Sequence, residues 1–157
     1  MPKKFKSLDY LLKPDNKFNS KLITKFVNSM MWDGKKNAST KILYKALDEV
    51  AKKINDAAPI DIFNKALDNV KPQVEVRPKR IGGATYQVPM AVPPKRQVSL
   101  AIRWILLSTR KKKGKPMHLK LADELAAAYK GEGDAMMFRQ NVHKMAEANK
   151  AFAHFAY

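Results

Sequence analysis

The chain has 157 residues and a formal net charge of +17, because 31 lysines and arginines outnumber 14 acidic residues. It contains no cysteine, which excludes disulfide bonds and cysteine-ligated zinc, and no apolar run approaches the roughly 20 residues that span a bilayer. The length suits a single domain, residues 1–157, with a hydrophobic core of its own.

The first third of the chain predicts a basic arm followed by a helix. Residues 1–17 are expected to form an extended arm that carries several lysines. Apolar residues then recur at helical spacing over residues 22–31, and Gly34 is the expected end of this helix. Lys35 and Lys36 follow, so we expect them beside the negative, C-terminal end of the helix, where capping competes with phosphate binding.

Two further helices precede a change of pattern. Residues 42–54 predict an amphipathic helix within a charge-balanced segment, and Pro59 suits the first turn of the next one, which ends at Lys71 and the proline after it. Their apolar faces are typical of core packing. The first half of the chain therefore predicts a helical bundle.

Residues 74–90, which read VEVRPKRIGGATYQVPM, carry the clearest strand pattern. Apolar and polar residues alternate on both sides of a glycine pair, which predicts a β-hairpin. A lone hairpin is marginally stable in water, so its base is expected to pack on helices through Val74, Val76 and Val88. Its tip is expected to project freely and consists of Lys79, Arg80, Ile81, Gly82 and Gly83.

The helix predicted at about residues 95–109 is apolar on nearly all sides and should be the most buried of the bundle. Arg96, Arg103 and Arg110 nevertheless recur every seven residues along it. Seven helical steps return to the same face with about 20° of drift, so these arginines form one narrow stripe. A flexible basic loop is expected to follow at residues 110–115.

The remaining chain predicts two helices and an aromatic end. Pro116 opens a fifth helix that stops at Gly131, and Asp134 can cap a sixth. The C-terminal residues 151–157 are aromatic and nearly uncharged, which favours packing on a partner or on RNA. The predicted fold is thus mainly α: a six-helix bundle with a protruding two-stranded hairpin and a basic N-terminal arm.

No arrangement of residues indicates catalysis, a metal site or a cofactor. His118, His143 and His154 are scattered without metal-ligand spacing. Asp123 and Glu124 are adjacent on a helix and point in different directions. An RNA-modifying enzyme is therefore disfavoured, and no cofactor is expected.

The segregation of charge indicates what the chain binds. Residues 71–115 hold twelve basic residues and one acid, whereas residues 37–70 and 116–157 each hold five of either sign. Five of the six arginines fall within 71–115, and arginine binds phosphate bidentately and stacks on bases. This distribution favours a nucleic acid over a membrane surface. Basic residues on an arm, a hairpin, a helix and loops suit a folded RNA better than a DNA groove.

Four segments together resemble the bacterial-type small-subunit ribosomal protein seven family. They are KPDNKFNSKLITKFVNSMMWDGKK, PQVEVRPKRIGGATYQVP, SLAIRWILLSTRKKKGK and HKMAEANKAFAHFAY, and the resemblance covers essentially the full length. It implies a structural protein of the small ribosomal subunit, cytoplasmic and bacterial, with an organellar ribosome as the alternative. It also implies binding to the three-prime major domain of small-subunit rRNA and nucleation of head assembly.

The resemblance further implies that the hairpin tip, Lys79 to Gly83, faces exit-site tRNA and the mRNA exit path. Neighbouring ribosomal proteins of the head and platform are the other expected partners. The chain is not expected to bind a membrane or a second copy of itself. The expected rRNA-binding residues are Lys3, Lys4, Lys6, Lys35, Lys36, Lys71, Arg77, Lys95, Arg96, Arg103, Arg110, Lys111, Lys112, Lys113 and Lys115.

The chain departs from the family's usual residues at the start of the sixth helix. The family usually places lysines where this chain has Met137 and Phe138, which favours a protein or intramolecular contact at the start of the sixth helix.

The alternative function is a DNA architectural protein whose basic hairpin enters the minor groove. Such proteins use two arms of a dimer, and no self-complementary dimer face is evident in the sequence.

Overall fold

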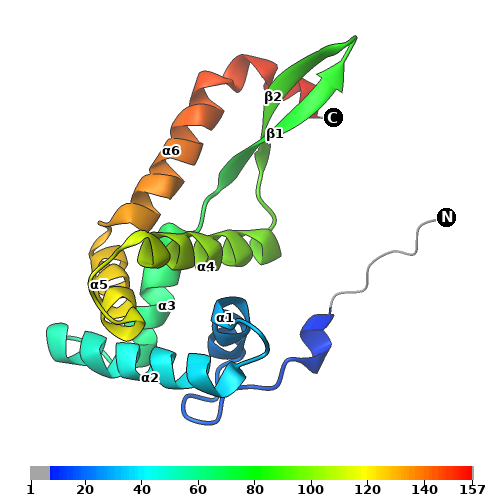
Figure 1. Ribbon diagram of the computed structural model, residues 1–157. Coiled ribbons are helices and arrows are strands. Elements are labelled where there is room, and N and C mark those ends of the chain that lie inside the picture. Colours follow the sequence, from blue (N-terminus) through cyan, green and yellow to red (C-terminus); the bar gives the residue numbers. More distant parts are fainter. Residues whose placement is uncertain (1–7, 157) are drawn as a thin grey trace.

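The helical periodicity of the sequence is realised as six α-helices within residues 8–156, the part of the chain that the computed structural model describes (Figure 1). Two short 3-10 helices, which the sequence did not predict, lie at the two ends: η1 (Leu8–Leu11) and η2 (Lys150–Ala156). The mainly α class is confirmed. The α-helices are α1 (Lys21–Met30), α2 (Lys36–Lys53), α3 (Pro59–Val70), α4 (Pro94–Lys111), α5 (Met117–Lys130) and α6 (Asp134–Ala148).

The hydrophobic core lies where α1 to α5 meet. α5 packs against α2, α3 and α4, and its residues Leu121, Ala122 and Leu125 are fully buried. Phe26 of α1 meets Phe63 of α3 edge to face, with ring centroids 5.4 Å apart. This central packing fixes α4, which crosses above α1 in Figure 1. None of the described helices is both long and apolar enough to cross a membrane.

Several helix boundaries follow the predicted signals. Pro59 occupies the first position of α3 as predicted, and Pro94 occupies that of α4, one residue before the predicted start; the missing N–H of proline is not needed at either position. Gly131 ends α5 in the left-handed conformation with φ 83°. Gly133 has φ 96°, and a Cβ there would lie 3.0 Å from the Ala127 Cβ, so the α5–α6 turn requires a glycine.

The segment between α1 and α2 corrects the expectation for Lys35 and Lys36. α1 already ends at Met30, and a turn over residues 32–35 reverses the chain, with the Lys35 N–H donating to the Trp32 carbonyl at 2.9 Å. Lys35 is the N-cap of α2 and Lys36 its first residue. Both lysines therefore lie at the positive end of α2 and cannot cap α1.

The N-terminal arm is only partly extended in its described portion, since residues 8–11 form η1. Asp15 then stabilises a turn: its carboxylate accepts the N–H groups of Lys17 and Phe18, each at 3.1 Å. The same carboxylate accepts the Tyr44 hydroxyl at 2.6 Å. The end of the arm is thus attached to α2.

The hairpin is formed by β1 (Val74–Ile81) and β2 (Ala84–Ala91), and it is one residue longer than predicted. Ile81 pairs with Ala84, so Gly82 and Gly83 alone make the turn. Their φ values are 56° and 89°, and a type I′ turn requires positive φ at both positions. Together with α6, the hairpin rises away from the bundle (Figure 1).

The base of the hairpin packs differently from the expectation. Val88 is buried as predicted, with 1% of its surface exposed, but Val74 and Val76 are only half-buried. The buried residue between those two valines is Glu75, at 7% exposure. The strand was predicted correctly, but the face of β1 that packs inward was not. Hydrophobicity favoured the face with Val74 and Val76, whereas the buried face carries the salt-bridged carboxylate of Glu75.

The C-terminal segment packs on the hairpin of its own chain. In η2, the rings of Phe152 and Phe155 each lie 5.2 Å from the ring of Tyr86 on β2. The Lys79 ammonium group donates to the Phe155 carbonyl at 2.6 Å. These contacts correct two expectations: in this structure the aromatic tail packs within the chain, and the hairpin is supported up to Lys79.

A buried carboxylate joins α4, α5 and α6. Glu124 of α5 is fully buried, and its Oε1 atom accepts the N–H of Ala135 at 2.8 Å. Its Oε2 atom accepts the Lys112 ammonium group at 2.5 Å. Glu124 therefore satisfies a free N–H at the start of α6, since the N-cap residue Gly133 has no side chain to do so.

Candidate nucleic-acid interface

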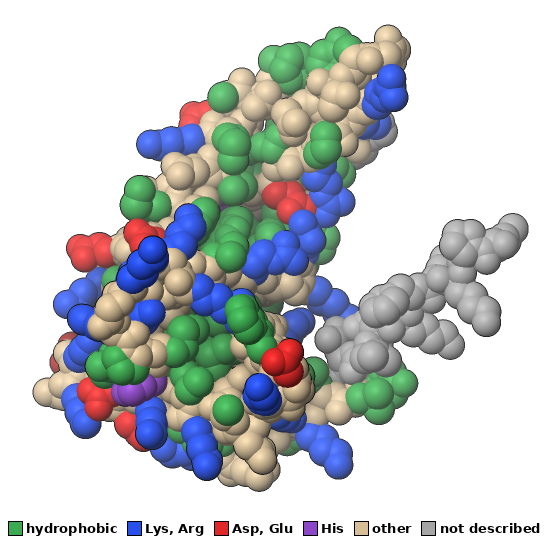
Figure 2. Space-filling view, viewed as in Figure 1, with side chains coloured by type: hydrophobic (Ala, Val, Ile, Leu, Met, Phe, Trp, Pro, Cys, Tyr) green, Lys and Arg blue, Asp and Glu red, His purple; other side chains and the backbone are tan. Residues whose placement is uncertain are grey.

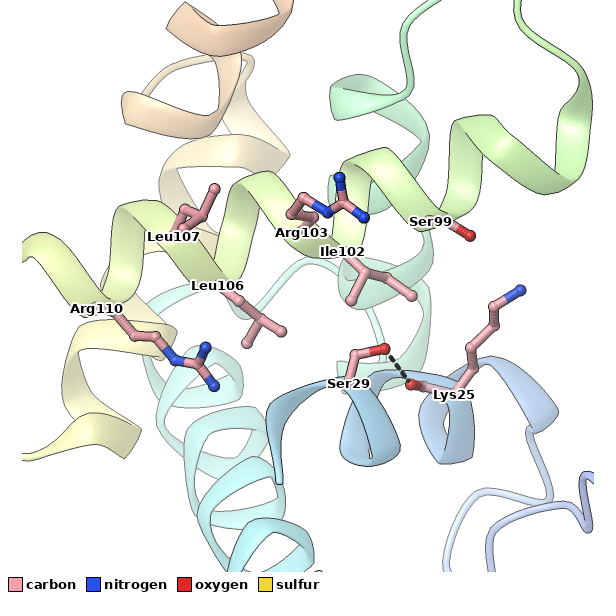
Figure 3. Close-up of a pocket in the computed structure, with 8 residues that line it drawn as sticks. All are labelled: Lys25, Ser29, Ser99, Ile102, Arg103, Leu106, Leu107 and Arg110. Carbon is pink, nitrogen blue, oxygen red and sulfur yellow. Dashed lines mark hydrogen bonds between the residues drawn. The ribbon is translucent and has the colours of Figure 1, made fainter. Parts of the chain in front are cut away.

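A groove between α1 and α4 brings cationic side chains together, and we call it the α1–α4 groove (Figure 3). Its cavity volume is about 270 Å³. Ile102 and Leu106 lie between the two helices, and Lys25, Arg103 and Arg110 surround them. The remaining lining residues are Ser29, Ser99 and Leu107. A polar, cationic groove of this kind suits a phosphate backbone.

The arginine stripe predicted on α4 is present, and Arg96, Arg103 and Arg110 are all exposed within the helix. Arg103 makes no hydrogen bond or ion pair with any other residue in the described part of the chain. It lines the α1–α4 groove, and along α4 it lies between Arg96 and Arg110, which both have intramolecular partners. Arg103 is therefore the arginine of the stripe most available for an external anion.

Arg96 and Arg77 share one buried carboxylate. An Nη atom of Arg77 lies 2.5 Å from Glu75, and the Arg96 Nε atom lies 3.2 Å from the other carboxylate oxygen. The Glu75 side chain is 10% exposed, whereas the arginines are 50% and 44% exposed. Glu75 thus joins β1 to the start of α4 and fixes the direction of both guanidinium groups.

Arg110 lies at the other end of the stripe. One of its Nη atoms donates to the Met30 carbonyl at 3.0 Å, and its guanidinium carbon lies 5.1 Å from the Trp32 ring centroid. Arg110 therefore satisfies a carbonyl at the C-terminal end of α1. It also lines a second groove, formed by the turn after α1 and the start of α2.

The basic segment at residues 110–115 divides into different roles. Lys111 still belongs to α4 and lies over the Phe138 ring at 4.8 Å. Lys112 pairs with the buried Glu124, so it holds the fold together. Lys113 is exposed, and Lys115 pairs with Asp123 at 3.2 Å. Phe138, one of the two residues that depart from the family pattern, thus makes intramolecular contacts with Lys111 and Trp104, whereas the other, Met137, is exposed.

The other predicted residues are spread over the surface. Lys95 lines a shallow apolar groove beside Lys25, and Lys36 lines a separate groove, formed mainly by polar residues, beside the N-terminal turn. Lys71 caps α3 and pairs with Asp68 at 2.5 Å. At the hairpin tip Arg80 is exposed and Ile81 half-buried. Lys3, Lys4 and Lys6 lie outside the described residues.

Three shifted pKa values reflect intramolecular contacts. Burial lowers the pKa of His143, and the charge of the nearby Arg139 lowers it further. The Nε2 atom of His143 accepts the Gln73 N–H at 3.2 Å, at the base of the hairpin. Burial and the hydrogen bond to Asp15 raise the pKa of Tyr44. Hydrogen bonds from Lys53 and Lys115 lower the pKa of Asp123, against the effect of burial. No group of three or more His, Asp or Glu in the described residues could hold a metal ion.

Sequence reasoning missed Lys25 as a candidate site residue. Lys21, Lys25 and Ser29 recur every four residues and therefore share one face of α1. That spacing was visible in the sequence, but which face of α1 borders α4 depends on tertiary packing.

Figure 2 shows lysine and arginine side chains over the region of α4 and along the hairpin on the same side of the molecule. The sequence profile of the family described as ribosomal protein S7p/S5e matches residues 2–150. The chain belongs to this family. The predicted resemblance is thereby confirmed.

Individual bacterial S7p/S5e proteins are similar to the chain over most of their length. The small ribosomal subunit protein uS7 of Rhodopirellula baltica is 56% identical over 144 residues, which cover 91% of this chain and 92% of that protein. The uS7 protein of Borrelia hermsii is 50% identical over 155 residues, with 99% of each chain covered. The uS7 protein of Pseudothermotoga lettingae is 51% identical over 141 residues, 90% of each chain.

Membership in the S7p/S5e family decides between classes of function. The family comprises structural, non-enzymatic ribosomal proteins, which confirms the expectation that the chain is not an enzyme. RNA binding is a general property of the family. The cationic groove and the arginine stripe are therefore candidates for an RNA interface.

We predict that Glu75→Gln loosens the hairpin. The change removes the charge that Arg77 and Arg96 share, so the free energy of unfolding should fall by about 1–3 kcal/mol. Amide hydrogen exchange should accelerate in β1 and β2 and stay unchanged in α2. The matched control is Asp68→Asn, which removes an exposed ion pair with Lys71 and should cost no more than about 1 kcal/mol. Equal effects of the two substitutions would contradict the role assigned to Glu75.

Proposed function

We propose that the chain is a structural constituent of the small ribosomal subunit that binds the three-prime major domain of its rRNA directly and nucleates assembly of the head. The observation that carries this proposal is the α1–α4 groove, where Arg103 has no partner among the described residues and lies between helices that the core holds in place. Rigid helices present the cations at fixed spacing, which favours a folded RNA with phosphates in fixed positions.

The proposed rRNA surface extends from the α1–α4 groove in two directions. Towards the hairpin it includes Arg96 and Arg77, which Glu75 orients, and the nearby Lys95. Towards α2 it includes Arg110 and Lys35. Lys112 is excluded, because its pairing with the buried Glu124 is a structural role.

We further infer that the hairpin tip contacts exit-site tRNA and the mRNA path. The tip projects from the bundle and carries the exposed Arg80. The two turn glycines at its end are open to solvent: a Cβ added to Gly82 or Gly83 would have no atom of the described residues within 4 Å, apart from its chain neighbours. A projecting element with little contact to the core suits a ligand that binds and leaves. The DNA architectural alternative loses its support, because the chain belongs to a ribosomal protein family.

We predict that Arg103→Gln weakens binding to the three-prime major domain rRNA. Loss of one phosphate contact should make the slope of log affinity against log salt concentration shallower by about 0.7–0.9. The control is Lys41→Gln, which removes one charge from the exposed face of α2 and should leave the slope unchanged. Filter binding over a salt series measures both. An unchanged slope in Arg103→Gln, or an equal change in Lys41→Gln, would place the rRNA surface elsewhere.

We predict that the double variant Lys79→Gln and Arg80→Gln assembles into small subunits but retains exit-site tRNA poorly. Neither residue belongs to the Gly82-Gly83 turn, although Lys79→Gln also removes the hydrogen bond to the Phe155 carbonyl, so incorporation of the variant into subunits serves as the check on its fold. The control is Lys41→Gln with Lys45→Gln, which removes the same charge from α2. Incorporation into subunits and tRNA retention are measured for both variants. Failure of the tip variant to incorporate, or normal tRNA retention, would contradict the role proposed for the tip.

A further inference from the structure

Trp32 is an exposed indole in a fixed position. Its exposed fraction is 68%, whereas that of Trp104, the other tryptophan of the chain, is 8%. Trp32 begins the turn between α1 and α2, and the two residues after it, Asp33 and Gly34, have φ values of 52° and 69°. A positive φ is unfavourable for Asp33, so the turn holds a strained conformation that directs the chain between the helices.

The surroundings of Trp32 combine an apolar floor with cations. The groove beside it has a cavity volume of about 460 Å³, and Ile42 and Met117 contribute apolar surface. Lys35 and Arg110 supply positive charge to the same groove. Lys35 pairs with Asp33 at 3.7 Å, but both side chains are more than 70% exposed, so this ion pair screens little of the charge.

Arg110 connects this groove with the α1–α4 groove. It lines both, and its guanidinium group lies over the Trp32 ring while it is hydrogen-bonded to the Met30 carbonyl. Despite this contact the indole keeps 68% of its surface exposed. A strand whose phosphates lie along the α1–α4 groove can therefore continue past Arg110 to the indole.

We propose that Trp32 is a stacking platform for an unpaired base of the bound RNA, with Arg110 and Lys35 contacting the adjacent phosphates. An exposed ring flanked by cations is the arrangement with which proteins bind single-stranded nucleotides. Bases within an RNA helix have their faces covered by neighbours, so the proposed ligand is a loop or bulge nucleotide. This inference rests on the proposed rRNA binding and assigns one nucleotide contact within it.

The charge of the groove favours RNA over a segment of another protein. A protein partner would need acidic residues to match Lys35 and Arg110, whereas every RNA nucleotide carries both a stackable ring and a phosphate. A protein contact is instead one of the outcomes that the experiment distinguishes.

The experiment compares Trp32→Ala, Trp32→Phe and the unchanged chain, each as full-length protein, in binding to three-prime major domain rRNA. Trp32→Ala should weaken binding roughly 5- to 150-fold, the range for loss of one aromatic–base stack. Trp32→Phe keeps a ring and should retain most of the affinity. Because stacking releases no counterions, the salt slope of Trp32→Ala should match that of the unchanged chain, in contrast to Arg103→Gln.

Tryptophan fluorescence provides an independent readout. RNA should quench the emission of the unchanged chain, whereas Trp32→Phe, in which Trp104 is the remaining fluorophore, should keep its emission. Thermal unfolding of the free variants verifies that each is folded. Unchanged affinity of Trp32→Ala together with unquenched Trp32 emission in the complex would overturn the proposal, leave rRNA binding intact, and favour a protein contact. Absence of rRNA binding by the unchanged chain would overturn both.

Discussion

The position of the hairpin depends on the buried carboxylate of Glu75. It is the one acid in residues 71–115, and it pairs with Arg77 on its own strand and with Arg96 on α4. A single carboxylate thereby attaches the projecting hairpin to the helix that forms one side of the α1–α4 groove. Without it, two arginines would face each other at the hairpin base with no counter-charge. Glu75 makes it feasible to place so much positive charge on adjacent elements.

The basic residues of this S7p/S5e protein differ in how far intramolecular contacts already occupy them. Lys112 neutralises the buried Glu124 and serves the fold, whereas Arg110 donates one hydrogen bond to a carbonyl at the end of α1 and remains exposed to both grooves. Arg103, by contrast, has no partner within the described residues and lies over the α1–α4 groove. A net charge of +17 therefore overstates the charge available to RNA. The basic residues available to RNA are those that have no intramolecular partner or remain exposed despite one.

Local signals predicted the fold well, and long-range pairing limited the prediction of the site. The Gly82-Gly83 turn, the start of α3 at Pro59 and the seven-residue arginine stripe were all visible as short patterns. The burial of Glu75 was not, because its partner Arg96 is 21 residues away in the sequence. The packing of Phe155 on Tyr86 likewise joins segments that share no local pattern. Lys35 was misplaced because α1 ends at Met30, before Gly34.

We infer that one continuous face, from the hairpin base over α4 to the turn at Trp32, binds the rRNA. Lysine acetylation of the free and rRNA-bound protein, read by mass spectrometry, tests it most directly. We expect rRNA to protect Lys25, Lys35 and Lys95 from acetylation and to leave Lys41 and Lys45 on α2 as reactive as in the free protein. Protection of the two α2 lysines, with Lys25 and Lys95 still reactive, would contradict the claim.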